Sequence, residues 1–150
     1  MKRAYVILAA ALAALDQLVK FFVRATPQGS LLLDLSPVLT LTHRVNTGAA
    51  FSLFTGRTLW LALTSVALLR ALWLFLRRMH LTRAAELAIA GLFGGGIGNL
   101  IDRAFFGSVT DYIRLSFIDF PVFNLADIFI TVSVFALMLL LLTGRLEERD

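Results

Sequence analysis

The sequence predicts an all-α membrane protein: four transmembrane helices, with a small extracytoplasmic β-sheet between the first and second helices. The first observation is composition: 59% of the residues are hydrophobic, 16% are charged, and the mean hydropathy is +0.83. Soluble proteins average about 45–50% apolar and about 25% charged residues. The second observation is that the apolar excess lies in four blocks, each near the roughly 20 residues that a helix needs to cross a bilayer. We expect one integral membrane domain over residues 1–150, with spans at 5–22, 58–76, 84–101 and 122–142.

The first block has an alternative interpretation as a secretory signal peptide. The start "MKR" is followed by "AYVILAAALAAL", in which Ala11-Leu12-Ala13 fits a small-x-small cleavage site. The apolar run continues beyond that site, through Asp16 and Lys20, as far as Phe22. We therefore expect a first span that is retained in the protein.

The segment between the first two spans carries the predicted sheet. The stretch "LTLT" at 39–42 alternates apolar and polar side chains, which is typical of a half-buried strand. Pro37 precedes it and "NTG" at 46–48 follows it, and both are turn signals. We expect a strand at 38–45 in a small amphipathic sheet on the outer membrane surface.

Charge indicates the orientation and the partners. With four spans, both termini lie on one side, and the link "RRMHLTR" at 77–83 carries three arginines on that side. The positive-inside tendency then predicts that this link and both termini are cytoplasmic. The net charge of +4 could suggest nucleic acid, but the basic residues flank apolar runs and form no stripe. We expect membrane lipids as partners and no nucleic acid.

Several chemistries are disfavoured. The chain has no cysteine, which excludes disulfides, thiolate nucleophiles and thiolate metal sites. His43 and His80 fall on opposite sides of the predicted membrane, and neither HExxH nor G-x-S-x-G is present. We therefore expect no metal and no cofactor. The glycines of "GLFGGGIGN" at 91–99 are not followed by the lysine of a phosphate loop, and their small-xxx-small spacing predicts close helix packing.

Polar side chains gather at the outer ends of three spans and in the link between the last two. They are Asp16, Lys20, Asn99, Asp102, Arg103, Asp111, Asn124 and Asp127. Structural roles remain open for some of them, since Asp16 with Lys20 fits an ion pair and Asp102 with Arg103 fits an interface anchor. A random scatter of tolerated polar residues would not gather at one depth.

Two carboxylates at one depth are the best candidates for catalysis. When two such groups approach closely they cannot both ionise, so they share a proton near neutral pH. One can then activate a water while the other donates to a carbonyl, without a cofactor. A proton-relaying transporter and a structural subunit are the alternatives. A transporter should carry polar groups through the full depth, whereas the inner halves of the spans hold few besides Arg70 and Glu86.

Five sequence blocks follow one another along the chain: "DQLVK" at 16–20, "NTGAAFS" at 46–52, "GGGIGNLIDR" at 94–103, "VTDYI" at 109–113 and "FNLADIFI" at 123–130. In this order, and over essentially the full length of the chain, they resemble the bacterial lipoprotein signal peptidase (signal peptidase II) family. The resemblance implies an aspartyl endopeptidase of the bacterial cytoplasmic (inner) membrane, with no cofactor. Its implied substrate is a diacylglyceryl-modified prolipoprotein, cut just before the lipidated cysteine. We expect a monomer.

The resemblance also implies roles for individual residues. The catalytic pair would be Asp111 and Asp127. The supporting residues would be Asp16, Lys20, Asn46, Gly48, Asn99, Asp102, Arg103, Asn124 and Ala126. The segment 46–52 would close over the substrate. Tyr112 and Ile128 depart from residues common in the family, which bears on substrate preference.

Overall fold

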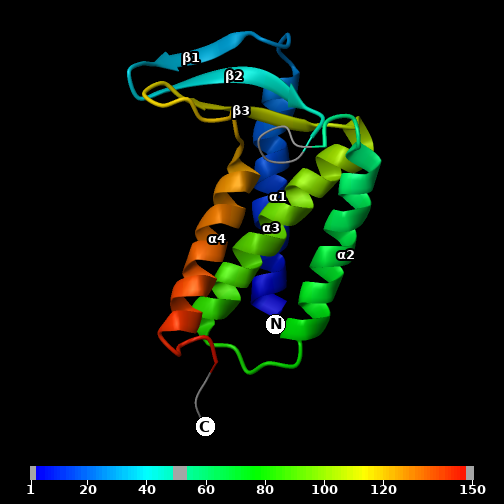
Figure 1. Ribbon diagram of the computed structural model, residues 1–150, viewed down its shortest axis with the longest axis vertical. Helices are drawn as coiled ribbons and strands as arrows, with labels where there is room; N and C mark the ends of the chain where they lie inside the picture. Colours follow the sequence, from blue (N-terminus) through cyan, green and yellow to red (C-terminus); the bar gives the residue numbers. More distant parts are fainter. Residues whose placement is uncertain (1–2, 49–53, 148–150) are drawn as a thin grey trace.

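The chain forms four long helices beneath a small antiparallel sheet (Figure 1). The computed structural model describes residues 3–48 and 54–147, and these counts refer to those residues. The helices are α1 (Arg3–Arg24), α2 (Thr58–Leu76), α3 (Arg83–Phe106) and α4 (Leu125–Leu142). Each is long and apolar enough to cross a membrane. The four predicted spans are therefore confirmed as helices.

Most helix boundaries lie within two residues of the predicted ones, and the two that differ by more do so for identifiable reasons. The third span was expected to end at residue 101, where charges begin, but α3 continues to Phe106 because Asp102 is paired inside the protein. It ends at Gly107, which adopts the left-handed conformation that favours glycine. The fourth span was expected from residue 122, but α4 starts at Leu125 because Asn124 caps it.

The central helix α3 packs against the other three helices. Its glycines permit this close approach, because a Cβ added at Gly94 would lie 2.8 Å from the Cβ of Leu12 in α1. One added at Gly98 would lie 3.1 Å from Cγ of Asp16, and one at Gly95 would meet the Ala126 backbone. The small-xxx-small spacing thus serves two neighbours: the Gly94 face packs on α1 and the Gly95 face on α4.

The sheet has three strands in the order β1 (Leu31–Leu35), β2 (Leu39–Asn46) and β3 (Val109–Leu115), and both pairings are antiparallel. The predicted strand at 38–45 corresponds to β2. The third strand extends the expected sheet, because it comes from the link between α3 and α4 and not from the segment between the first two helices. Its first four residues are all buried, so it carries no alternating pattern that would reveal a strand.

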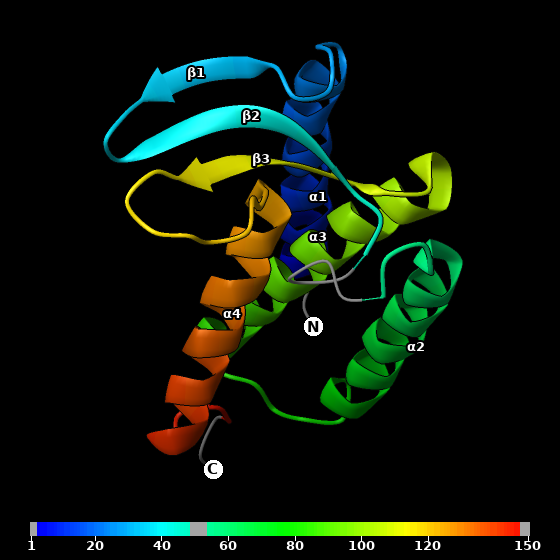
Figure 2. The same cartoon turned by 45° about the horizontal axis from the view of Figure 1, so that its top comes forward.

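The sheet covers one end of the helices, and α1 begins and α4 ends at the opposite end (Figures 1 and 2). Large apolar side chains such as Leu59, Leu68 and Leu142 are exposed along the helices, as expected for surfaces that face lipid. Near the end away from the sheet, the buried apolar cluster consists of Leu76, Leu81, Ala85 and Ile89. The buried polar side chains lie mainly at the sheet end, and this arrangement places the candidate site there.

Candidate active site

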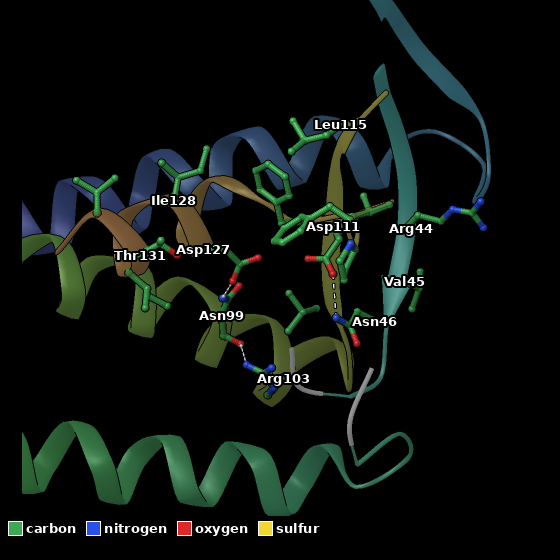
Figure 3. A pocket seen from close by; sticks show the side chains of 17 residues that line it. Arg44, Val45, Asn46, Asn99, Arg103, Asp111, Leu115, Asp127, Ile128 and Thr131 are labelled. Carbon is green, nitrogen blue, oxygen red and sulfur yellow. Dashed lines mark hydrogen bonds between the residues drawn. The ribbon is translucent and has the colours of Figure 1, made fainter. Parts of the chain in front are cut away.

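Asp111 and Asp127 point toward one another across a pocket of about 750 Å³ (Figure 3). Asp111 lies on β3, and Asp127 lies in the first turn of α4. Asn46, Asn99 and Arg103 also line the pocket, and the rest of its wall is largely apolar. Two carboxylates from different elements therefore face the same space.

Among the described residues, each carboxylate oxygen of the pair accepts one hydrogen bond. Asp111 Oδ2 accepts from Asn46 Nδ2 at 2.9 Å, and its Oδ1 accepts from Asn124 Nδ2 at 2.6 Å. Asp127 Oδ1 accepts from Asn99 Nδ2 at 2.8 Å, and its Oδ2 accepts from the Asn124 backbone N–H at 3.1 Å. These four bonds hold both groups in one orientation while each oxygen keeps a lone pair for another partner.

The orientation of the Asn99 amide is set by Lys20. The Lys20 ammonium donates to Asn99 Oδ1 at 2.8 Å, and Asn124 Nδ2 donates to the same oxygen at 3.2 Å. Because an ammonium can only donate, the amide oxygen must face it and the amide N–H₂ must face Asp127. Lys20 therefore acts on the pair through Asn99, without touching it.

Lys20 also joins two carboxylates in a buried ion cluster. Lys20, Asp16 and Asp102 are all fully buried, with Nζ 2.9 Å from Asp16 Oδ2 and 3.1 Å from Asp102 Oδ2. Arg24 adds a second cation, with Nη1 3.0 Å from Asp102 Oδ1. Two positive and two negative charges are thus balanced at the depth of the pair, which is how buried charges are tolerated. The expected Asp16–Lys20 ion pair is present.

The first turn of α4 is anchored by side chains from three elements. Asn124 Oδ1 accepts from the Asp127 N–H at 3.0 Å and forms a reciprocal capping box with Asp127. Asp16 Oδ1 from α1 accepts from the Ala126 N–H at 3.0 Å, and the Tyr112 hydroxyl from β3 accepts from the Leu125 N–H at 3.2 Å. The free N–H groups of a helix start are thereby satisfied, and Asp127 is fixed in place.

Ala126 supports the site through its small size, and Gly48 supports it through its backbone. Ala126 is fully buried, and its backbone carbonyl lies beside Gly95, so the contact with α3 leaves little room. Gly48 donates from its N–H to Asn46 Oδ1 at 2.9 Å, and its carbonyl accepts from Arg103 Nη2 at 3.2 Å. Arg103 thereby ties the end of β2 to α3.

The structure brings every residue of the predicted site into this network. One expectation concerns a segment that the structure describes only in part. Closure of the segment 46–52 over a substrate involves 49–52, which lie outside the described residues. Ile128, which was expected to bear on substrate preference, lines the pocket. Tyr112 instead is buried and contacts the start of α4 through its hydroxyl.

Burial raises the pKa of Asp111 to about 6. The hydrogen bond from the Asn46 side-chain amide opposes this rise, and the negative charge of Asp127 adds to it. Asp111 therefore exchanges its proton close to neutral pH. Such a carboxyl can act as an acid or a base under physiological conditions.

Three residues that belong to this network are not among the predicted site residues. Gln17 Nε2 donates to Asp102 Oδ1 at 2.9 Å, and Arg24 and Thr110 also contact Asp102. A signal was present for two of them, because Gln17 and Arg24 are seven apart and share a helix face with Lys20. Nothing in the sequence indicated Thr110, since its contact with Asp102 is made by the backbone N–H.

Comparisons with known proteins point to one family. The family model described as "Signal peptidase (SPase) II" matches residues 8–143. A lipoprotein signal peptidase of Dehalococcoides mccartyi is 41% identical over 130 residues, which cover 83% of this chain and 80% of that protein. The corresponding protein of Brevibacillus brevis is 36% identical, with 90% and 92% covered. That of Streptococcus pyogenes is 35% identical, with 93% of each covered.

Two solved structures, each described as a bacterial membrane enzyme, share the fold. One superposes with a TM-score of 0.88 at 27% identity and covers 98% of this chain and 94% of its own. The other has a TM-score of 0.83 at 29% identity, with 93% and 92% covered. The arrangement of four helices and a sheet is therefore shared with experimentally determined membrane enzymes.

Proposed function

The chain belongs to the signal peptidase II family, and on that premise we propose that it is an aspartyl endopeptidase acting on lipid-modified prolipoproteins. It removes the signal peptide from a diacylglyceryl-modified precursor by cutting before the lipidated cysteine. The observation that carries this proposal is the pair of carboxylates, Asp111 and Asp127, facing each other across the pocket at the sheet end of the helices.

Asp127 acts as the base toward the attacking water. It lies in the first turn of α4, at the electropositive N-terminal end of the helix. Asp111, with its pKa raised to about 6, holds the proton that it donates to the oxygen of the scissile carbonyl. Water adds to the carbonyl carbon as Asp127 takes its proton, which gives a neutral tetrahedral diol.

Collapse of the diol completes the reaction. Asp127 passes its proton to the amide nitrogen, the carbon–nitrogen bond breaks, and Asp111 recovers a proton from a diol hydroxyl. The pair returns to its starting protonation, and one water has been consumed. The carboxyl oxygens accept hydrogen bonds throughout the reaction from the side-chain amides of Asn46, Asn99 and Asn124. Because these amides are uncharged, they do not keep the proton on one aspartate of the pair.

The walls of the pocket suit a substrate that stays in the membrane. Val122, Ile128 and Val132 line one side, along and just before α4. An apolar signal helix can lie against this side while its lipid chains remain in the bilayer. The peptide bond before the modified cysteine then reaches the carboxylates at the interface.

The site lies near the outer face of the bacterial cytoplasmic membrane, both termini are cytoplasmic, and the enzyme works as a monomeric single domain. The arginine-rich link 77–83 supports this orientation, because it joins α2 and α3 at the end opposite the sheet (Figure 1).

The test is cleavage of a diacylglyceryl-modified prolipoprotein by the purified protein in detergent. Asp111→Asn and Asp127→Asn are compared with Asp34→Asn, which removes an exposed carboxylate on β1. We expect cleavage before the lipidated cysteine by wild type and Asp34→Asn, and a loss of about 10³-fold or more in each pair variant.

Cleavage that persists in a folded pair variant would remove that residue from the mechanism. No cleavage by folded wild type would overturn the proposed function. Proton flux into vesicles would then test the transporter alternative. A precursor without its lipid, run in parallel, reports whether the modification is required.

A further inference from the structure

Arg24, the last residue of α1, lies outside every sequence block on which the family resemblance rests, yet it connects three elements. Its Nη1 donates to Asp102 Oδ1 at 3.0 Å and to Thr110 Oγ1 at 3.4 Å. Its Nη2 donates to Gln17 Oε1 at 3.3 Å. The guanidinium also stacks on Phe106, with Cζ 4.1 Å from the ring centroid.

Asp102, which accepts a hydrogen bond from Arg24, is itself hydrogen-bonded to β3, the strand that carries Asp111. Asp102 is fully buried, and its Oδ2 accepts the Thr110 backbone N–H at 2.9 Å. Thr110 directly precedes Asp111 in β3. Arg24 therefore holds both the side chain of Thr110 and the carboxylate that binds the Thr110 backbone.

The regular pairing of β3 with β2 is interrupted directly after Asp111. The pairing of β2 with β3 shifts register between Leu41 and Arg44, and Arg44 is the residue opposite Asp111. A ladder that is irregular next to Asp111 constrains its backbone less than a regular one. A short connector joins the end of α3 to the start of β3. Arg24 contacts Phe106 before this connector and Thr110 after it.

We propose that Arg24 is a positioning residue for Asp111: through Asp102 and Thr110 it fixes where β3 begins, and so where the Asp111 carboxyl stands in the pair. The catalytic part of this inference rests on the proposed function. An arginine suits the role because its planar fork reaches Asp102, Thr110 and Gln17 from two nitrogens while its face stacks on Phe106. A lysine would supply the charge but only one nitrogen.

When Arg24 is replaced, other contacts of Asp102 still support the fold. Asp102 keeps its ion pair with Lys20 at 3.1 Å and its hydrogen bond from Gln17. The Arg24 side chain is 20% exposed, so water can replace part of it. The variants needed for a test therefore retain the buried ion cluster.

The first test does not depend on activity. Hydrogen exchange of residues 107–115 is measured by mass spectrometry for Arg24→Gln, Arg24→Lys and a control, Arg114→Gln, which removes an exposed arginine from the same strand. We expect exchange at least about tenfold faster in Arg24→Gln, an intermediate rate in Arg24→Lys and the wild-type rate in the control. Residues 83–100 of α3 serve as the internal reference. Unchanged exchange at 107–115 in Arg24→Gln overturns the proposal.

The second test separates positioning from binding. Arg24 does not line the pocket, so we expect Arg24→Gln to lower kcat about 10- to 100-fold with KM within about twofold of wild type. Arg24→Lys should recover part of kcat. A wild-type kcat in Arg24→Gln, or an effect on KM alone, overturns the catalytic part.

Two further outcomes are decided by the same variants. If Arg24→Gln does not fold, Arg24→Lys carries the test, and wild-type exchange and kcat in that variant overturn the proposal. If wild type itself cleaves no prolipoprotein, the proposed function fails. The exchange measurement then still decides whether Arg24 positions β3.

Discussion

Asn124 and Asp127 cap each other at the start of α4: the Asn124 amide oxygen accepts the Asp127 N–H at 3.0 Å, and Asp127 Oδ2 accepts the Asn124 N–H at 3.1 Å. A motif that usually only begins a helix here also holds a carboxylate of the proposed catalytic pair. The same Asn124 donates from Nδ2 to Asp111. One side chain thus connects helix stability to the geometry of both aspartates.

This double role can be separated by two substitutions of Asn124. Asn124→Ala removes the cap and the donor to Asp111, so we expect a loss of about 1–2 kcal/mol in the free energy of unfolding together with a loss of turnover. Asn124→Ser keeps a good cap but cannot reach Asp111, so stability should be retained while turnover falls. Thermal unfolding and prolipoprotein cleavage are the measurements. Full activity in Asn124→Ser would show that the bond to Asp111 is dispensable.

Replacement of Lys20 should destabilise the protein more than replacement of any surface charge does. Lys20→Met leaves Asp16 and Asp102 buried with one cation fewer, which costs about 3–5 kcal/mol for a broken buried pair. It also frees the Asn99 amide to rotate away from Asp127. The double variant Asp16→Asn with Lys20→Met should recover part of the stability, since it also removes one stranded carboxylate. Equal unfolding midpoints for Lys20→Met and wild type would contradict this account.

The dependence of activity on pH follows from Asp111. Because the pKa of Asp111 is raised to about 6, its proton is lost as pH rises through that value. If Asp111 is the proton donor, kcat/KM should fall about tenfold per pH unit above about 6. The measurement is cleavage at limiting substrate from pH 5 to 8. A flat profile over this range would remove Asp111 from the donor role.

Stability should change over a lower pH range, with a definite sign. The folded pKa of Asp111 lies above its ordinary value of 3.8, so the folded protein binds this proton more tightly than the unfolded chain does. The free energy of unfolding should therefore fall as pH rises from about 4 to about 6, by at most about 3 kcal/mol. Asp111→Asn should flatten this slope whatever its absolute stability. The same slope in the variant would contradict the assignment.

The sequence predicted features that depend on local composition and spacing. Four apolar runs of spanning length predicted the helices, and the spacing of Asp16 and Lys20 predicted their ion pair. It did not predict β3, because a strand buried on both faces has no alternation. It could not pair Asn99 with Asp127 or Arg24 with Asp102, because those contacts depend on how the helices are rotated against each other. Arg24, at the end of its span, has the position of an ordinary interface residue.

Two adjacent glycines of α3 give a matched test of how closely α4 must approach. A Cβ at Gly95 would meet the Ala126 carbonyl, a backbone atom in the turn that carries Asp127. A Cβ at Gly96 would lie 2.9 Å from Leu69 Cδ2, the end of a flexible side chain. Both alanines gain about 1 kcal/mol of helix propensity, so Gly96→Ala should be neutral or stabilising.

Gly95→Ala should instead destabilise by about 1–3 kcal/mol and lower turnover, because α4 must move and Asp127 moves with it. Thermal unfolding and cleavage of the two variants, side by side, check this difference. The gain in propensity is common to both, so a gap between them reports the difference in contacts: the Ala126 backbone and the Ile130 side chain at Gly95, and the Leu69 side chain at Gly96. If Gly95→Ala were as stable and as active as Gly96→Ala, the close approach of α3 and α4 would not be what sets the position of Asp127.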